Sequence, residues 1–290
     1  MKHDILEYRL EKFQIRTLED YKKFQKTTID SYSKHIQEID KRKPEIEMEF
    51  VVEGYSYTAN SIVKFECDYK YSLGFPVVNW RERLTCPLTH LNNRARAAIH
   101  IVDTFFNIKN DTNIYIMEQT TPIFNFIKKK YNYVIGSEYL GDSVPFGSVN
   151  KNGIRNEDAT CLTFDKNSLD LILSFDVFEH IPNYKLAFLE CFRVLRDGGH
   201  MFFSVPFAIL SEENIIRATI DKDGLVSHIL PPIYHGDPMN SEEGVLCYHD
   251  FGWAMLTDLL EAGFSDAYAL IYWSTDFGYF GSQIQFIVKK

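Results

Sequence analysis

From residue 113 almost to the C-terminus, short apolar runs alternate with segments of helical periodicity, and this alternation constrains the fold more than any other feature. Parallel strands require long crossover connections, which helices of this length provide. The pattern therefore predicts an α/β fold, with a mainly parallel sheet that carries helices on both faces. We expect strands at 113–117, 133–140, 169–175 and 201–207, with helices at 121–131 and 183–195 between them.

The two ends of the chain differ from this alternation. Residues 1–46 show apolar residues at helical spacing and predict one or two amphipathic helices that end at Pro44. Residues 47–107 predict a small β-rich element followed by a connecting helix, and 108–290 form the expected core. An insert at 208–250 interrupts the core, with a hairpin that turns between Asp221 and Gly224. The last two apolar segments predict an antiparallel pair.

Composition excludes several classes of protein. With 290 residues, of which 45% are hydrophobic, the chain can bury a core and is not disordered. The formal charge is 31 − 40 = −9, which disfavours nucleic acid and anionic membranes as partners. No apolar stretch is long enough for a membrane span, so we expect a cytoplasmic protein. Its five scattered cysteines predict reduced thiols without disulfides.

Residues 168–207 resemble strand four, helix four and strand five of class I S-adenosylmethionine-dependent methyltransferases. In that family an acid ends the strand, Glu-His follows, and a leucine-rich helix leads to a Gly-Gly turn, here Gly198 and Gly199. The wider resemblance covers 113–290. It implies a Rossmann-like methyltransferase sheet with a C-terminal antiparallel hairpin, S-adenosylmethionine as cofactor and S-adenosylhomocysteine as product.

The turn after the first expected strand departs from the common family pattern. The family usually has a glycine-rich loop here, whereas residues 117–122 contain no glycine. The turn is similar to that of a subgroup with Glu-Gln-Thr/Ser-x-Pro, often encoded among glycan-building genes. The resemblance implies that Glu118 pairs with the ammonium group of the cofactor, while Gln119, Thr120 and the helix amides hold its carboxylate. The alternative is a capped helix start that binds no ligand.

The resemblance places the other cofactor contacts at the ends of later strands. Glu138, flanked by Gly136 and Tyr139, occupies the position of the acid that binds the ribose hydroxyls. Asp158 matches the acid that reads the adenine amino group, with Ala159 offering its amide, although an aspartate that caps a turn is the competing interpretation. Further contacts are expected at the end of the fourth strand, from Ser174, Phe175 and Asp176.

Candidate acceptor-side residues come from the insert and from the Glu-His pair. Transfer to a hydroxyl needs alignment and can need a base. We predict that His235 is this base, with Asp237 as its orienting partner or as a ligand for a sugar hydroxyl. A histidine that merely stabilises a turn is the alternative for His235. His180 either faces the acceptor or packs beneath the cofactor, and Asp250 is expected to cap the next helix.

Cysteines in the β-rich element resemble the remnant of a zinc knuckle that relatives of this subgroup carry. Cys67, Cys86 and residues 92–96 are retained, but Thr89 and His90 stand where the last Cys-Gly would be. Two cysteines and one histidine fall short of a four-ligand site, so we expect no metal. Arg94 and Arg96 line the acceptor cleft or a solvated helix face. The aromatic residues expected to form the core in place of metal are Phe65, Tyr69, Tyr71, Phe75 and Trp80.

The sequence therefore predicts an S-adenosylmethionine-dependent methyltransferase that O-methylates a sugar or other polar small acceptor in bacterial surface-glycan or secondary metabolism. A NAD-dependent or nucleotide-sugar enzyme is disfavoured, because no Gly-x-Gly-x-x-Gly follows the first strand. An inactive scaffold with a methyltransferase fold is the second alternative. The expected partners are a small-molecule or glycan acceptor and a second copy of the chain, bound through the N-terminal helices.

Overall fold

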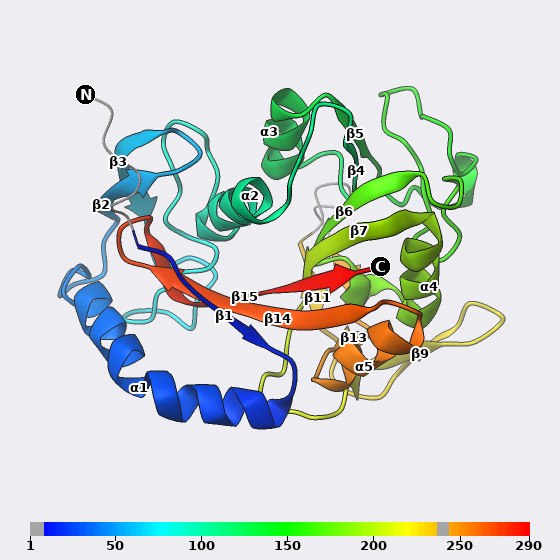
Figure 1. Cartoon of the computed structure of the whole chain (residues 1–290). Helices are drawn as coiled ribbons and strands as arrows, with labels where there is room; N and C mark the ends of the chain where they lie inside the picture. Colours follow the sequence, from blue (N-terminus) through cyan, green and yellow to red (C-terminus); the bar gives the residue numbers. More distant parts are fainter. Residues whose placement is uncertain (1–8, 237–243) are drawn as a thin grey trace. The chain divides into compact units, whose positions relative to one another are not determined.

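The computed structural model describes residues 9–236 and 244–290 (Figure 1). The chain divides into two compact units, each built from several segments. The first unit comprises Met1–Ile15, Lys22–Ile108 and Leu270–Ile284, and the second comprises Arg16–Tyr21, Lys109–Ala269 and Gln285–Lys290.

A seven-stranded mixed sheet has the order β1-β14-β15-β7-β6-β4-β5. The four strands from β7 to β5 pair in parallel, whereas β15 is antiparallel to β7. This arrangement confirms the predicted α/β class and its C-terminal antiparallel strands. The strands are β1 (Glu11–Ile15), β4 (Asn113–Ile116), β5 (Tyr133–Gly136), β6 (Leu169–Phe175), β7 (Leu195–Ser204), β14 (Asp266–Ser274) and β15 (Tyr279–Lys289).

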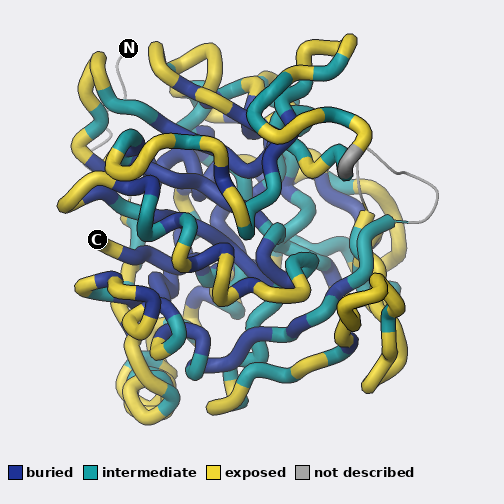
Figure 2. Tube along the Cα trace, turned by 90° about the vertical axis from the view of Figure 1, so that its right-hand side faces the viewer, coloured by how far each residue is buried: buried dark blue, intermediate teal, exposed yellow. Residues whose placement is uncertain are grey.

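The parallel strands are apolar because the middle of the sheet has no solvent-facing side. In β6, Leu171, Ile172 and Leu173 are at most 2% exposed, and Ile172 stands opposite both Tyr115 of β4 and Met201 of β7. Continuous apolar runs are typical of strands that are buried on both faces. Figure 2 shows that the buried parts of the trace run mainly through the interior and the exposed parts mainly along the outside.

Helix α3 (Pro122–Lys130) of the second unit begins and ends as local sequence rules require. The Thr121 side chain accepts a hydrogen bond from the Phe124 amide and Pro122 fills the first turn. Three lysines lie in its last turn, where they stabilise the negative end of the helix dipole. Helix α4 (Tyr184–Val194) packs on β7 and on α5 (Ala254–Glu261).

The N-terminal segment corrects one expectation. A single helix, α1 (Leu18–Asp40), is present, but Glu11–Ile15 form the strand β1 beside β14. Its burial alternates with period two, and Phe13 stacks on Trp273 with 5.1 Å between ring centroids. Pairing with the sheet edge satisfies the backbone of this short segment, and an isolated helix of that length is marginal.

Helix α1 is also the longest described helix, with 23 residues. It is rich in lysine and glutamate, and no helix in the described part of the chain is both long and apolar enough to cross a membrane.

The β-rich element of the first unit is a hairpin of β2 (Phe50–Ser56) and β3 (Ser61–Cys67). Its core contains Phe65 and Tyr69, with Trp80 packed against it. Tyr71 is 76% exposed and Phe75 is 40% exposed, so these two aromatic residues were wrongly assigned to the core. The turns that carry them extend beyond the hairpin into solvent.

Helix α2 (Asn93–Phe105) follows this hairpin, and the Asn92 side chain caps it by accepting a hydrogen bond from the Ala95 amide. Arg96 does not line a cleft or a solvated face. It is fully buried, lies 3.8 Å above the Phe65 ring and donates to the carbonyls of Phe277 and Gly278.

The insert folds into short antiparallel pairs, among which the predicted hairpin around Asp221 and Gly224 is confirmed. Asp250 does not cap α5, which begins at Ala254; its carboxylate lies 2.6 Å from the Arg217 guanidinium. The strands are β8 (Ile215–Ile216), β9 (Ala218–Ile220), β10 (Val226–His228), β11 (Tyr234–His235), β12 (Val245–Leu246) and β13 (His249–Asp250), and two short 3-10 helices are η2 (Gly141–Ser143) and η3 (Phe178–His180).

Candidate functional site

The strand order places a topological switch point between β4 and β6. From β4 the chain runs through α3 to β5 on one side, whereas β6 lies on the other side. Open α/β sheets bind ligands outside the carboxyl ends of strands at such a point. The segments that follow these strand ends, 117–121 after β4 and 176–180 after β6, are the ones singled out from the sequence.

The glycine-free turn after β4 is held by the acid that follows β5. One oxygen of Glu138, Oε1, accepts hydrogen bonds from the Gln119 amide at 2.7 Å, the Thr120 amide at 2.9 Å and the Thr120 hydroxyl at 2.8 Å. No hydrogen bond from a described residue reaches the other oxygen, Oε2. Half-buried Glu138 therefore fixes the turn with one oxygen and keeps the second as an acceptor.

The side chain of Gln119 joins the same turn to the connection after β5. Its amide nitrogen donates to the Gly153 carbonyl at 2.8 Å, and its oxygen accepts from the Arg155 amide at 2.8 Å. Near residues 154–156 the chain forms isolated bridges, including one between Glu138 and Asn156. Side-chain hydrogen bonds thus order the region where the family usually relies on glycine.

The other predicted cofactor residues differ in their burial and in the hydrogen bonds that they already make. A Cβ atom on Gly136 would lie 2.4 Å from the Phe124 ring and 2.7 Å from the Glu118 carbonyl, so this glycine allows the strand and helix to approach. Glu118 is buried, whereas Tyr139 is 66% exposed. Asp158 accepts from the amide and hydroxyl of Thr160 through Oδ1, which is a turn-capping arrangement, and half-buried Ala159 lies between them.

At the end of β6, the three predicted residues have different surroundings. Phe175 is 7% exposed and packs edge-on against Phe202 in the core. Asp176 adopts a φ of 58° and accepts a hydrogen bond from the Ser204 hydroxyl at 2.8 Å. The Ser174 hydroxyl is buried without a hydrogen-bond partner among the described residues.

The donor set fits an adenosine cofactor with an amino-acid tail. Glu138 offers a carboxylate acceptor suited to a diol, and Asp158 keeps Oδ2 clear of the Thr160 contacts that occupy Oδ1. The first turn of α3 supplies backbone amides and the positive end of a helix dipole for a carboxylate. These features come from three separate segments of the second unit.

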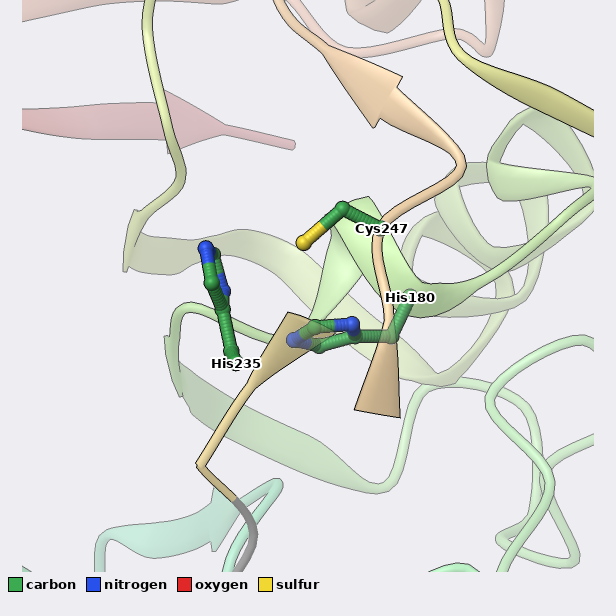
Figure 3. A group of neighbouring side chains, drawn as sticks. All are labelled: His180, His235 and Cys247. Atoms are coloured by element: carbon green, nitrogen blue, oxygen red, sulfur yellow. The ribbon is translucent and has the colours of Figure 1, made fainter. Parts of the chain in front are cut away.

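A second group of functional side chains lies after β6 and in the insert. Figure 3 shows His180, His235 and Cys247 pointing toward one another. They come from η3, β11 and the residue after β12, and their ligand atoms all lie within 4.8 Å of one another. Asp237, predicted to assist His235, lies outside the described residues. The sequence predictions for His180 and His235 are thus brought into one cluster.

Glu179 and Cys247 complete this cluster, and sequence reasoning did not assign either to the site. The Glu179 Oε1 atom is 3.2 Å from His235 Nδ1 and 3.7 Å from His180 Nε2. Glu179 is fully buried and Cys247 is 1% exposed. The adjacent Glu-His pair was the one available signal for Glu179, whereas Cys247 is 67 positions from His180 and gives no local signal.

Electrostatic coupling in the cluster alters the predicted role of His235. The neighbouring Cys247 thiol and Glu179 carboxylate raise the pKa of His235 to about 10, in spite of desolvation. Burial alone would raise the pKa of Cys247, but hydrogen bonds to His180 and His235 lower it overall. Such an imidazole keeps its proton at neutral pH, so acting as a base requires that something displace the proton.

Comparison with known proteins identifies the central part of this unit. Residues 125–203, from within α3 to within β7, match the family model described as a methyltransferase domain. No curated protein matches the chain.

Solved structures with detectable similarity include three methyltransferases. A S-adenosylmethionine-dependent methyltransferase from Mesorhizobium loti is 16% identical, covers 67% of this chain and 98% of its own, and has a TM-score of 0.43. A putative one from Listeria monocytogenes is 10% identical, with 68% and 98% covered and a TM-score of 0.41. Phosphoethanolamine N-methyltransferase 2 of Haemonchus contortus, in complex with S-adenosyl-L-methionine, is 12% identical, with 60% and 37% covered and a TM-score of 0.36.

Proposed function

We propose that this methyltransferase-domain protein uses S-adenosylmethionine to methylate a polar small molecule. The specific form that we propose is O-methylation of a sugar or related hydroxyl compound in bacterial surface-glycan or secondary metabolism. The observation that carries the proposal is the Glu138 carboxylate at the switch point, which organises the turn before α3 and keeps one oxygen available.

Each cofactor residue has a role that its geometry permits. Glu138 Oε2 accepts from the ribose hydroxyls, and Asp158 accepts from the adenine amino group. Thr120 and the α3 amides hold the carboxylate, with Glu118 beside the ammonium group. Tyr139 lies exposed next to Glu138, where its ring can cover the nucleoside. S-adenosylmethionine, when bound, supplies an electrophilic methyl group on a sulfonium.

For methyl transfer, the main task of the protein is to align the methyl donor with the acceptor. Transfer to a hydroxyl forms a C–O bond as the S–C bond breaks, and the acceptor oxygen loses one proton. The acceptor side is assigned to the Glu-His end of β6 and to the insert, because His180 and His235 meet there. Polar side chains at this edge favour a polar acceptor, whereas the fold itself names none.

Calorimetric titration of the full chain tests the cofactor assignment. We expect micromolar binding of S-adenosylmethionine and S-adenosylhomocysteine, and no binding of NAD or of a nucleotide sugar. Absence of binding by the sulfur nucleotides would favour the inactive scaffold, since the side-chain hydrogen bonds of the turn would then have replaced the ligand.

A matched pair of variants tests Glu138. Glu138→Gln keeps an oxygen for the turn but puts an amide donor where the ribose needs an acceptor, so we expect affinity to fall by about tenfold or more. The exposed Asp197→Asn removes a charge from the same unit and should bind as wild type does. Equal affinity of wild type and Glu138→Gln would show that the ribose assignment is wrong.

A further inference from the structure

We propose that His180, His235, Cys247 and Glu179 form a zinc site that fastens the insert to the end of β6. Imidazole, thiolate and carboxylate are the ligands that Zn²⁺ takes in proteins, and structural sites are closed by four of them. Within the described residues, the group of side chains able to hold a metal ion is His180, His235 and Cys247, and Glu179 adjoins it. The site goes beyond the methyltransferase activity and does not depend on it.

The spacing of the donor atoms suits one tetrahedral ion. Zinc bonds of about 2.0–2.3 Å place two ligand atoms about 3.3–3.7 Å apart. Glu179 Oε1 lies 3.2 Å from His235 Nδ1 and 3.7 Å from His180 Nε2. The histidine and cysteine atoms lie within 4.8 Å of one another, which small side-chain rotations can shorten to ligand spacing.

His180 is oriented as metal-bound histidines are. Its Nδ1 lies 2.9 Å from the Leu246 carbonyl, an acceptor, so this nitrogen carries the hydrogen. The lone pair of the neutral ring then lies on Nε2, which faces Glu179 and the cluster. A hydrogen bond from the second ring nitrogen to a carbonyl is the usual outer contact of a zinc histidine.

Glu179 provides an independent indication that this cluster suits a cation. The residue is fully buried, and neither of its carboxylate oxygens accepts a well-formed hydrogen bond from any described residue. A buried carboxylate without compensation is costly, and His235 approaches it only as a close contact. A divalent ion balances the two negative charges of Glu179 and a Cys247 thiolate while both histidines remain neutral.

Backbone hydrogen bonds hold the ligand-bearing segments together. His235 pairs with Val245 across β11 and β12, and the Cys247 amide donates to the Ile233 carbonyl at 2.8 Å. The Tyr248 amide donates to the Glu179 carbonyl at 2.7 Å, which attaches the insert to η3. The site is therefore prepared by main-chain contacts, and the metal would add a clasp between the insert and the methyltransferase domain.

Metal loading of the full chain tests the site. Protein stripped with a chelator and titrated with Zn²⁺ should bind about one ion per chain. Co²⁺ in place of zinc should give the near-ultraviolet charge-transfer band of a cobalt–thiolate bond. Zn²⁺ should also raise the thermal midpoint and slow proteolysis within the insert, because the ion binds the folded chain preferentially.

Matched variants identify the ligands. Cys247→Ser and His180→Gln should each weaken zinc binding by about a hundredfold and abolish the effect of zinc on the midpoint, and Glu179→Gln should weaken binding less. Cys161→Ser changes an exposed cysteine of the same unit and should bind zinc as wild type does. Circular dichroism establishes that each variant is folded.

Two outcomes would overturn the proposal. One is wild-type protein that binds no stoichiometric zinc, and the other is zinc binding that survives both Cys247→Ser and His180→Gln. Calorimetry with S-adenosylhomocysteine on the same samples is independent of the metal content. If the chain binds zinc but not S-adenosylhomocysteine, only the proposed function is contradicted. If it binds S-adenosylhomocysteine but not zinc, only the zinc site is contradicted.

Discussion

Two regions of the molecule contain buried cysteines, and their surroundings differ. In the first unit, Cys67 and Cys86 belong to an apolar core with Phe65, and burial raises the pKa of Cys67 to about 12. In the second unit, Cys247 lies beside two histidines and has a lowered pKa. Cys67 is therefore a small apolar group of the core, whereas Cys247 is a candidate thiolate ligand.

This contrast shows that a sequence pattern typical of a metal site and the side chains able to bind a metal can lie in different parts of a chain. The cysteines that resemble a zinc knuckle stand in a region whose described residues contain no group of metal-binding side chains. The cluster capable of binding metal draws its members from three distant positions instead. Burial of apolar and aromatic side chains stabilises the region around Cys67 and Cys86, whereas Cys247 is surrounded by ionisable side chains.

The largest expected effect concerns the core of the first unit. Arg96→Ala should lower the free energy of unfolding by about 3–5 kcal/mol, since it leaves a cavity and two unpaired carbonyls at Phe277 and Gly278. Denaturant unfolding measures the loss. Zinc content should not change, because the residues of the proposed zinc site belong to the second unit.

Arg94→Ala is the control for this variant. Its partly exposed side chain lies 3.3 Å from Glu82, and such pairs contribute about 1 kcal/mol or less. A loss as large as that of Arg96→Ala would contradict the buried role given to Arg96.

The next largest loss of stability is expected from a substitution at Gly244 of the insert, and Gly224 provides the control. Gly244 has a φ of 70°, and a Cβ there would lie 2.3 Å from the His235 carbonyl oxygen. Gly244→Ala should displace His235, cost about 2–3 kcal/mol and reduce zinc affinity. Gly224 also has a positive φ, of 81°, but open space around it, so Gly224→Ala should cost about 1 kcal/mol and leave zinc affinity intact. Equal zinc affinities would contradict the assignment of His235.

A smaller effect is expected from the cysteines of the first unit. Cys86→Ala removes a sulfur that is fully buried and lies 3.4 Å from the Ser56 hydroxyl, which should cost about 1–2 kcal/mol. Atomic absorption should find the same metal content as in wild type. Loss of metal in this variant would reverse the comparison and restore the knuckle as a metal site.

The smallest effect at neutral pH concerns His35 of α1. Burial, assisted by Arg42, lowers the pKa of His35 to about 4 from 6.5. Because the unfolded chain binds a proton below pH 6.5 and the folded chain resists it until about pH 4, stability falls as the pH drops through this window. His35→Phe should lose less stability between pH 7 and pH 5 than wild type does. The exposed His228→Gln serves as control, and an unchanged pH dependence in His35→Phe would refute the assignment.

The fold was predictable wherever local pattern and global structure agree. The strands around Tyr115 and Ile172, the cap at Thr121 and the hairpin at Gly224 follow from apolar runs, capping chemistry and turn residues. Strand β1 was not predictable, because EKFQI fits either periodicity and pairing with β14 decided its conformation. Tertiary contacts override weak local preferences in short segments.

The sequence by itself determined the α/β class and the acids that follow the strands, since both depend on order along the chain. Tertiary structure alone decided that Glu138 supports the turn at Thr120 and that Cys247 meets His180 and His235. The physical reason is the distance along the chain over which each interaction acts. Periodicity and capping act over a few residues, whereas a carboxylate or a thiol acquires its partners and its pKa from segments that folding brings together.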